Sequence, residues 1–180
     1  MQGEHISKAL EGMLKSNRQA AEILRQHGSL AMTDITGFGL LGHLNRLLLG
    51  VTMDASDSTK EHSDTASGEV SGRAVGARIA LENVPILEGA QELSARGIRS
   101  SLWLQNQKSL SEVVVHSNVN TDRSELLLDP QTSGGLLAIV PKASYAACVD
   151  ALVKAAYSDA MSIGHVQSRA SIEIMHDSKA

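Results

Sequence analysis

Residues 33–39, Thr33-Asp34-Ile35-Thr36-Gly37-Phe38-Gly39, combine one carboxylate, two hydroxyls and two glycines. A predicted strand over residues 29–34 precedes this stretch and a predicted helix over residues 40–49, ending at Gly50, follows it. A turn of this kind presents backbone N–H groups that favour phosphate oxygens, and Asp34 could hold the Mg²⁺ that accompanies a nucleotide. From the residues alone, the favoured interpretation is that an Asp or Thr of this stretch only caps the helix. The residues alone leave both interpretations open.

A second polar stretch, residues 129–135, lies between two apolar runs and contains Asp129, Thr132, Ser133 and the pair Gly134-Gly135. The hydroxyls could donate to an anion, and the glycines would let the backbone approach a ligand closely. Tight connections between strands select the same residue types without any ligand. This stretch therefore has a structural and a functional interpretation, of which the structural one is favoured.

The histidines and the single cysteine give weaker signals. His43 falls on the helix after the glycine turn, where packing or capping is the favoured role. The other histidines share no metal-ligand spacing and form no pair with the cysteine that would suggest zinc. Cys148 falls on the apolar stripe of a predicted helix, which favours an inert core thiol over a nucleophile.

The elements that must position these residues mix helices and strands. Apolar residues at helical spacing predict one leading helix over residues 6–27 that stops at Gly28. Apolar runs, alternation and proline or glycine boundaries predict the rest: helices from Pro85 to near Gly97 and over 145–156, and strands over 75–81, 113–115, 126–128, 136–140, 162–166 and 171–175. The strand, helix, strand order over 136–166 predicts a right-handed crossover. The expected class is a layered α/β or α+β domain with a mixed sheet.

Residues 54–73 differ in composition from the rest of the chain. Ser, Thr, Asp, Glu and Gly dominate, and Val70 is the only large aliphatic residue after Met53 and before Val75. Ordering such a segment has little apolar burial to offset its entropy cost, which predicts a mobile acidic loop inserted into a single domain over residues 1–180. This loop carries most of the net charge of −4.

Composition excludes several classes of protein. A chain of 180 residues with 42% apolar residues can form one core, and a single cysteine excludes a disulfide-rich secreted scaffold. The acidic balance and the 2% aromatic content argue against a nucleic-acid binder. No apolar run approaches a membrane-spanning helix, and the first residues do not form a signal peptide. A cytoplasmic location is expected, with an organelle interior left open.

Three stretches together resemble selenophosphate synthetase, also called selenide, water dikinase, in its C-terminal domain only. They are AMTDITGFGLLGHL (31–44), VGARIALENVPILEGAQELSARG (75–97) and LLLDPQTSGGLLAIVP (126–141), of which the last is the most specific. The Gly37-Phe38-Gly39 turn separates the selenium branch from other aminoimidazole ribonucleotide synthetase-like enzymes. Residues 98–101 with Gln105-Asn106 are similar to the subset fused to a pyridine-nucleotide oxidoreductase.

The resemblance implies a reaction in which ATP, selenide and water give selenophosphate, AMP and phosphate, with Mg²⁺ on the nucleotide. It assigns Asp34 as a Mg²⁺ ligand and suggests phosphate contacts at Thr33, Thr36, Gly37 and Gly39. The family's other metal aspartates and its catalytic cysteine or selenocysteine belong to an N-terminal domain that these 180 residues lack.

Two functional hypotheses follow. In the first, the chain is the C-terminal half of such an enzyme, which works with its own N-terminal ATP-binding domain, forms a homodimer, and binds neither nucleic acid nor membrane. The isolated chain is then expected to be inactive. In the alternative, the chain is a truncated, non-catalytic paralogue that acts as a dimerisation or regulatory module.

Overall fold

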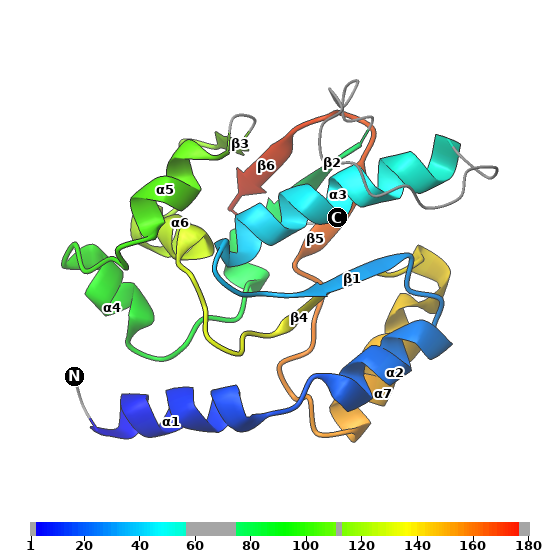
Figure 1. Cartoon of the computed structure of the whole chain (residues 1–180), viewed down its shortest axis with the longest axis horizontal. Helices are drawn as coiled ribbons and strands as arrows, with labels where there is room; N and C mark the ends of the chain where they lie inside the picture. The colour runs from blue at the N-terminus through cyan, green and yellow to red at the C-terminus, as the bar shows by residue number, and fades with distance from the viewer. Residues whose placement is uncertain (1–2, 57–74, 111–112, 177–180) are drawn as a thin grey trace, which may run out of the picture.

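The structure is a computed structural model that describes residues 3–56, 75–110 and 113–176 (Figure 1). Of the predicted acidic loop, residues 57–73 lie outside the described residues, so the prediction of mobility is not tested there. Residues 54–56 are helical instead, because the preceding helix continues through Gly50.

Helices and strands alternate irregularly along the chain. The α-helices are α1 (Gly3–Leu14), α2 (Arg18–Gln26), α3 (Gly39–Ser56), α4 (Ala90–Ala95), α5 (Trp103–Lys108), α6 (Thr121–Glu125) and α7 (Tyr145–Lys154). The strands are β1 (Ala31–Asp34), β2 (Gly76–Ala80), β3 (Val113–Val115), β4 (Leu136–Ile139), β5 (Gly164–Gln167) and β6 (Ile172–Met175). Three 3₁₀ turns, η1 (Leu81–Asn83), η2 (Leu126–Leu128) and η3 (Lys142–Ser144), complete the described elements.

The strands form two separate sheets. One has four strands in the order β3-β6-β2-β5 and is mixed, since β6 is parallel to both β2 and β3 whereas β5 is antiparallel to β2. The other is an antiparallel pair of β1 and β4, in which Asp34 lies opposite Leu136. The mixed α/β class and the mixed sheet are therefore confirmed.

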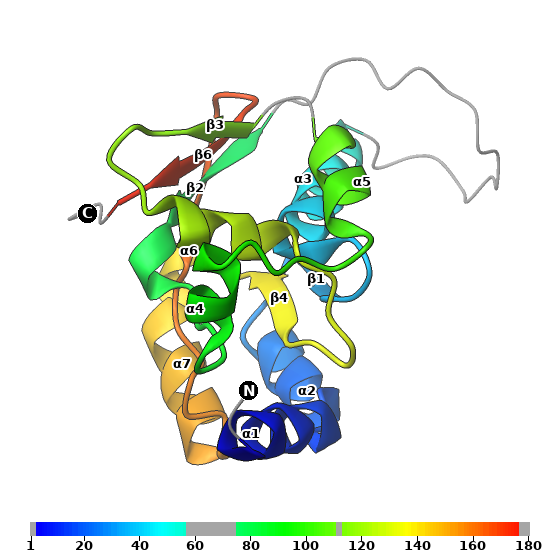
Figure 2. The same ribbon diagram turned by 90° about the vertical axis from the view of Figure 1, so that its left-hand side faces the viewer.

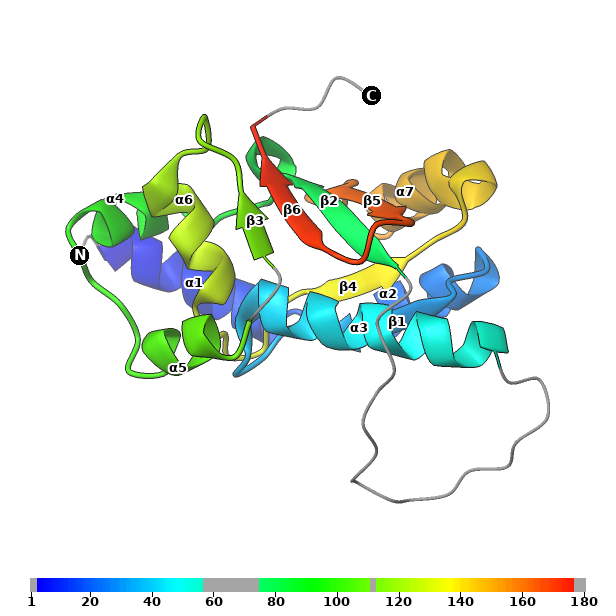
Figure 3. The same ribbon diagram turned by 90° about the horizontal axis from the view of Figure 1, so that it is seen from above.

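The elements stack in layers (Figure 2). The four-stranded sheet lies at one end, α3 packs between it and the β1–β4 pair, and α2 and α7 cover the other face of that pair. Seen from above, α3 runs alongside β1 and β4 (Figure 3).

The apolar core divides between the two interfaces. In the larger part, the leucines of α3 pack with Ala77 and Ile79 of β2 and with Ile172 and Ile174 of β6. In the smaller part, Leu24 of α2 and Cys148 of α7 are buried with the neighbouring side chains of β1 and β4. The alternation of side chains along β1 explains the division, because successive residues face opposite layers.

The predicted single leading helix is wrong, since α1 and α2 are separate. The break at residues 15–17 is fixed by tertiary hydrogen bonds: the Tyr157 hydroxyl donates to the carbonyl oxygen of Ser16 at 2.8 Å, and Asn17 Nδ2 donates to that of Gly134 at 3.0 Å. None of the residues of α1 is buried, so no core packing holds α1 in line with α2.

Two further predictions around residues 126–166 are wrong. Leu126–Leu128 is the 3₁₀ turn η2 rather than a strand, and Leu127 and Leu128 are buried beside α3. A short apolar run does not distinguish a buried strand from a buried turn. The crossover through α7 is also wrong, because β4 and β5 lie in different sheets.

Three element boundaries differ from prediction. The helix expected from Pro85 begins at Ala90, after Gly89 with a φ of 81°. Helix α5 lies in a stretch for which the sequence predicts no element, and α3 does not stop at Gly50. None of the described helices has the length and apolar content needed to cross a membrane.

Candidate functional site

The turn at residues 35–38 connects β1 to α3 and is held by hydrogen bonds at both ends. The backbone N–H of Ile35 donates to Gly135 O at 2.9 Å, and the N–H of Gly39 donates to Thr36 O at 3.1 Å. The N–H of Thr36 donates to the Nε2 atom of His43 at 3.0 Å, with the Thr36 hydroxyl oxygen 3.1 Å from the same nitrogen. His43 is buried and accepts this backbone hydrogen bond, so the packing or capping role predicted for it is confirmed.

The two polar stretches of the sequence lie against each other. The backbone N–H of Gln131 donates to Thr36 O at 3.0 Å, and Gly135 O accepts from Ile35 as described above. The β1–β4 pairing therefore continues past the strands and brings residues 33–39 and 129–135 into one surface. Gln131, Thr132 and Ser133 are exposed on that surface, and Ser133 has a left-handed φ of 49°.

Two glycines allow this close approach. Gly39 has a φ of 66°, and a Cβ atom there would lie 2.8 Å from the carbonyl carbon of Leu128 and 2.9 Å from the carbonyl oxygens of Leu127 and Leu128. A Cβ atom at Gly134 would lie 2.3 Å from Ile35 O. Both positions require glycine because the neighbouring backbone occupies the space of a side chain.

Asn106 of α5 connects the glycine turn to Leu128, the residue directly before the second stretch. It is 5% exposed, and its Nδ2 donates to Gly37 O and to Leu128 O, each at 2.9 Å. The sequence predictions did not single out Asn106 as a site residue. A buried amide in a short helix is a signal that only the structure makes visible, because burial cannot be inferred from six residues.

Asp34 ends β1 with an exposed side chain. Its register opposite Leu136 places it on the sheet face of Met32, which packs toward α2 and α7. No described residue donates a hydrogen bond to the Asp34 carboxylate or forms an ion pair with it, so the capping interpretation of Asp34 is not observed. An exposed carboxylate without a protein partner suits a cation that keeps most of its water ligands.

The other predicted phosphate-contact residues differ in whether their donor groups are already hydrogen-bonded within the protein. The N–H groups of Thr36 and Gly39 are engaged inside the protein, and the Thr33 hydroxyl donates to Asp34 O at 3.1 Å. Gly37 is the open position, since a Cβ atom there would meet nothing within 4 Å.

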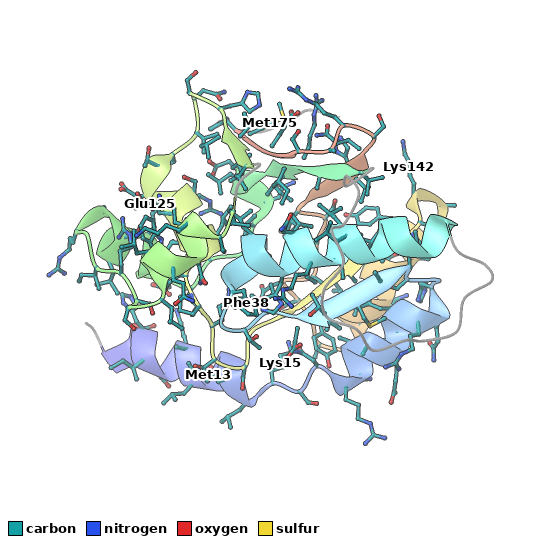
Figure 4. All side chains as sticks on the ribbon, turned by 45° about the horizontal axis from the view of Figure 1, so that its top comes forward. Met13, Lys15, Phe38, Glu125, Lys142 and Met175 are labelled. Atoms are coloured by element: carbon teal, nitrogen blue, oxygen red, sulfur yellow. The ribbon has the colours of Figure 1, made fainter. Side chains whose placement is uncertain are left out.

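An aromatic and cationic cluster flanks the turn at the start of α3. Phe38 is 45% exposed, its ring centroid lies 5.6 Å from that of His43, and the Arg46 guanidinium carbon lies 4.8 Å from the Phe38 centroid (Figure 4). The guanidinium over the ring face is a cation–π contact. It places one positive charge beside the glycine turn.

Two hollows of the structure lie away from the candidate site. Two hollows of about 470 and 570 Å³ are lined by parts of α4 with α6 and of the α1–α2 junction with the end of α7, and neither includes residues 33–39 or 129–135. Among the described residues, no three His, Cys, Asp or Glu side chains gather as a metal site. Asp34 is therefore a candidate single ligand, and the described residues do not form a complete metal centre around it.

Cys148 lies away from this surface, in the smaller core between α2 and α7. Burial raises the pKa of its thiol. A buried thiol with a raised pKa is a poor nucleophile, so the interpretation of Cys148 as an inert core residue is confirmed.

Comparison with known proteins finds several relatives that share one name. No protein-family model matches the chain. The selenide, water dikinase of Caldanaerobacter subterraneus is 30% identical over 168 residues, which are 92% of this chain and 42% of the relative. Selenide, water dikinase 2 of Peptoclostridium acidaminophilum is 32% identical over 87% of this chain and 39% of the relative, and the Clostridioides difficile enzyme is 34% identical over 74% and 33%.

The chain thus spans about one third to two fifths of the length of these relatives. The agreement covers most of this chain and is shared by relatives from several organisms that carry the same name. Over most of its length, the chain is homologous to the C-terminal region of the selenide, water dikinases.

Proposed function

We propose that the chain is the C-terminal part of a selenophosphate synthetase, in which ATP, selenide and water give selenophosphate, AMP and phosphate. The observation that carries the proposal is the single surface formed by residues 33–39 and 129–135, with the unpaired carboxylate of Asp34 at its edge. Residues 129–135 belong to the most specific part of the resemblance to the family, and residues 33–39 belong to another of its three parts.

In this proposal, Asp34 contributes one ligand to Mg²⁺, and the open backbone at Gly37 is the best placed contact for a phosphate oxygen. Bound Mg²⁺ would neutralise charge on the nucleotide phosphates. Mg²⁺ usually takes only one or two protein carboxylates beside substrate oxygens and water, so a single aspartate is a sufficient contribution from this part. The rigid turn holds Asp34 in place, and Arg46 adds positive charge nearby.

The remaining parts of the site are proposed to come from an ATP-binding domain outside these 180 residues, in a homodimeric enzyme. The exposure of Asp34 and of residues 131–133 supports this arrangement, since a phosphoryl-transfer site must be closed to water. Among the described residues, no three His, Cys, Asp or Glu side chains gather as a metal site, and Cys148 is buried.

The test replaces the matching region of the Caldanaerobacter relative with this chain and measures AMP formed from ATP, Mg²⁺ and selenide. We expect selenide-dependent turnover, and we expect Asp34→Asn to lower it by about 100-fold or more, because the amide loses the charge that holds the cation. The thermal midpoint should change by less than about 2 °C, since the carboxylate has no partner in the described protein.

The matched control is Asp150→Asn, which removes an exposed carboxylate from α7. It should leave both turnover and the thermal midpoint unchanged. A folded chimera without selenide-dependent turnover would contradict the proposed function and favour the non-catalytic module. Normal turnover with Asp34→Asn would remove Asp34 from the site.

A further inference from the structure

The side chain of Asn106 donates two hydrogen bonds from one buried nitrogen to two segments that are far apart in sequence. Gly37 O belongs to the turn after β1, and Leu128 O belongs to η2, directly before the loop at residues 129–135. Both bonds measure 2.9 Å. The bond to Leu128 O is buried and the bond to Gly37 O is partly buried, so that losing the donor costs free energy most of all at Leu128.

Asn106 is itself held in place by the elements around it. Trp103 Nε1, one turn earlier in α5, donates to Glu125 O at 2.9 Å, and the Arg99 guanidinium is paired with the Glu125 carboxylate. The Ser109 hydroxyl donates to Asn106 O at 2.8 Å. The amide therefore reaches the turn from a fixed base and is not a surface side chain that swings freely.

The position of the turn depends on this contact for a second reason. Gly39 packs so closely against the backbone of Leu127 and Leu128 that a Cβ atom there would overlap it. Asn106 ties that same backbone to Gly37, so that the start of α3 and η2 are joined by packing on one side and by the amide on the other. A shift of η2 would move the turn, and with it the end of β1 that carries Asp34.

We propose that Asn106 is a positioning residue of the site: its amide locks the glycine turn onto η2 and thereby fixes Asp34 and the Gly37 backbone relative to the loop at residues 129–135. The structural part of this inference stands on the hydrogen bonds alone. Its consequence for phosphoryl transfer rests on the proposed function.

The chemistry of the side chain makes the inference specific. One amide nitrogen carries two N–H groups, and each is used on a different carbonyl group. Aspartate has the same shape but only accepts hydrogen bonds when ionised, so Asn106→Asp would set a carboxylate oxygen against two carbonyl oxygens. Asn106→Ala removes the donors without adding a charge and serves as the second variant if the aspartate variant does not fold.

The first measurement is amide hydrogen exchange on the 180-residue chain. The N–H groups of Ile35, Gly39 and Gln131 should exchange about tenfold faster in the Asn106 variants, beyond any change shared with the core amides of β2 and β6. The control is Ser94→Ala, which removes another buried donor to a distant carbonyl group, Asp122 O at 2.6 Å, between α4 and α6.

Ser94→Ala should leave exchange at the three turn amides unchanged. If these amides exchange equally fast in the wild-type chain and in both Asn106 variants, or if Ser94→Ala accelerates them as much, the inference is overturned, whatever the chain does in catalysis.

The second measurement uses the chimera described above, with Mg²⁺ varied at saturating ATP. We expect Asn106→Ala to raise the Mg²⁺ concentration at half-maximal turnover by about tenfold or more, because the ligand is displaced rather than removed, whereas Ser94→Ala leaves it unchanged. Faster exchange with an unchanged Mg²⁺ requirement would contradict the role in the site. An inactive wild-type chimera combined with faster exchange in the variants would contradict the proposed function and leave the locking role supported.

Discussion

At the scale of single residues, the site depends on positions where the backbone leaves no room for a side chain. Gly39 combines a left-handed φ of 66° with three backbone atoms inside 3.0 Å of where its Cβ would be. Gly50, in the middle of α3, has open space around it and serves as the comparison. A side chain would therefore clash with neighbouring backbone at Gly39, whereas at Gly50 it would have room.

We predict that Gly39→Ala destabilises the chain by about 3 kcal/mol, since it adds both backbone strain and a clash with η2. Gly50→Ala should stabilise it by about 1 kcal/mol, because alanine loses less backbone entropy in a helix. Unfolding in urea, followed by circular dichroism, measures both changes. A Gly39→Ala variant as stable as the wild type would show that the turn can move away from η2.

At the scale of elements, several polar side chains on the outer face of the four-stranded sheet contact one carboxylate. Glu173 of β6 has a side chain that is only 5% exposed, with Arg78 Nε at 3.2 Å and Gln167 Nε2 at 3.3 Å from its oxygens. Arg169 and the Ser171 hydroxyl lie at 3.4 Å, and His116 lies at 3.7 Å. Glu173 therefore links β2, the β5–β6 turn and the end of β3.

The hydrogen bond from Gln167, followed by the charges of Arg78 and Arg169, holds the pKa of Glu173 below its ordinary value of 4.5. A carboxylate with a lowered pKa stabilises the fold above pH 4.5, and that contribution is lost as the pH falls through the folded pKa. We predict that Glu173→Gln lowers the thermal midpoint at pH 7 and that the difference from wild type narrows below pH 4.5.

Thermal melts between pH 3 and pH 7 test this prediction. Glu22→Gln is the control, because it removes the carboxylate of an exposed ion pair with Arg18 within α2, which contributes little. A difference between Glu173→Gln and wild type that stays constant with pH would mean that the charge of Glu173 does not act on stability.

At the scale of the whole molecule, the described chain folds around its own core but leaves Asp34 and residues 131–133 exposed. The core spans α3, both sheets, α2 and α7, and does not require the surface formed by residues 33–39 and 129–135 to be covered. The chain is therefore expected to fold without a partner on that surface.

We predict that the purified 180-residue chain unfolds in one cooperative thermal transition and forms no AMP from ATP and selenide. The reason is that its single thiol is buried and that no three metal-ligating side chains gather among the described residues. Calorimetry and a selenide-dependent AMP assay check the two parts. Selenide-dependent AMP formation by the isolated chain would contradict the proposal that other residues complete the site.

The sequence by itself determined the local features with strong short-range signals. The helical spacing over residues 145–156 predicted α7, and the alternation over residues 75–81 predicted β2. The helical spacing over residues 6–27 predicted helical structure there but not the break between α1 and α2. The chemical character of residues 33–39 and the buried state expected for Cys148 were also readable from residue types alone.

Only the tertiary structure decided how distant segments meet. Leu126–Leu128 is a 3₁₀ turn because α3 and Gly39 pack against its backbone, and residues 15–17 interrupt a helical pattern because Tyr157 and Gly134 bind them there. Asn106 became part of the site because α5 buries it between Gly37 and Leu128. Such contacts depend on three-dimensional neighbours, and the free energy of burying and pairing polar groups is not encoded in any one segment.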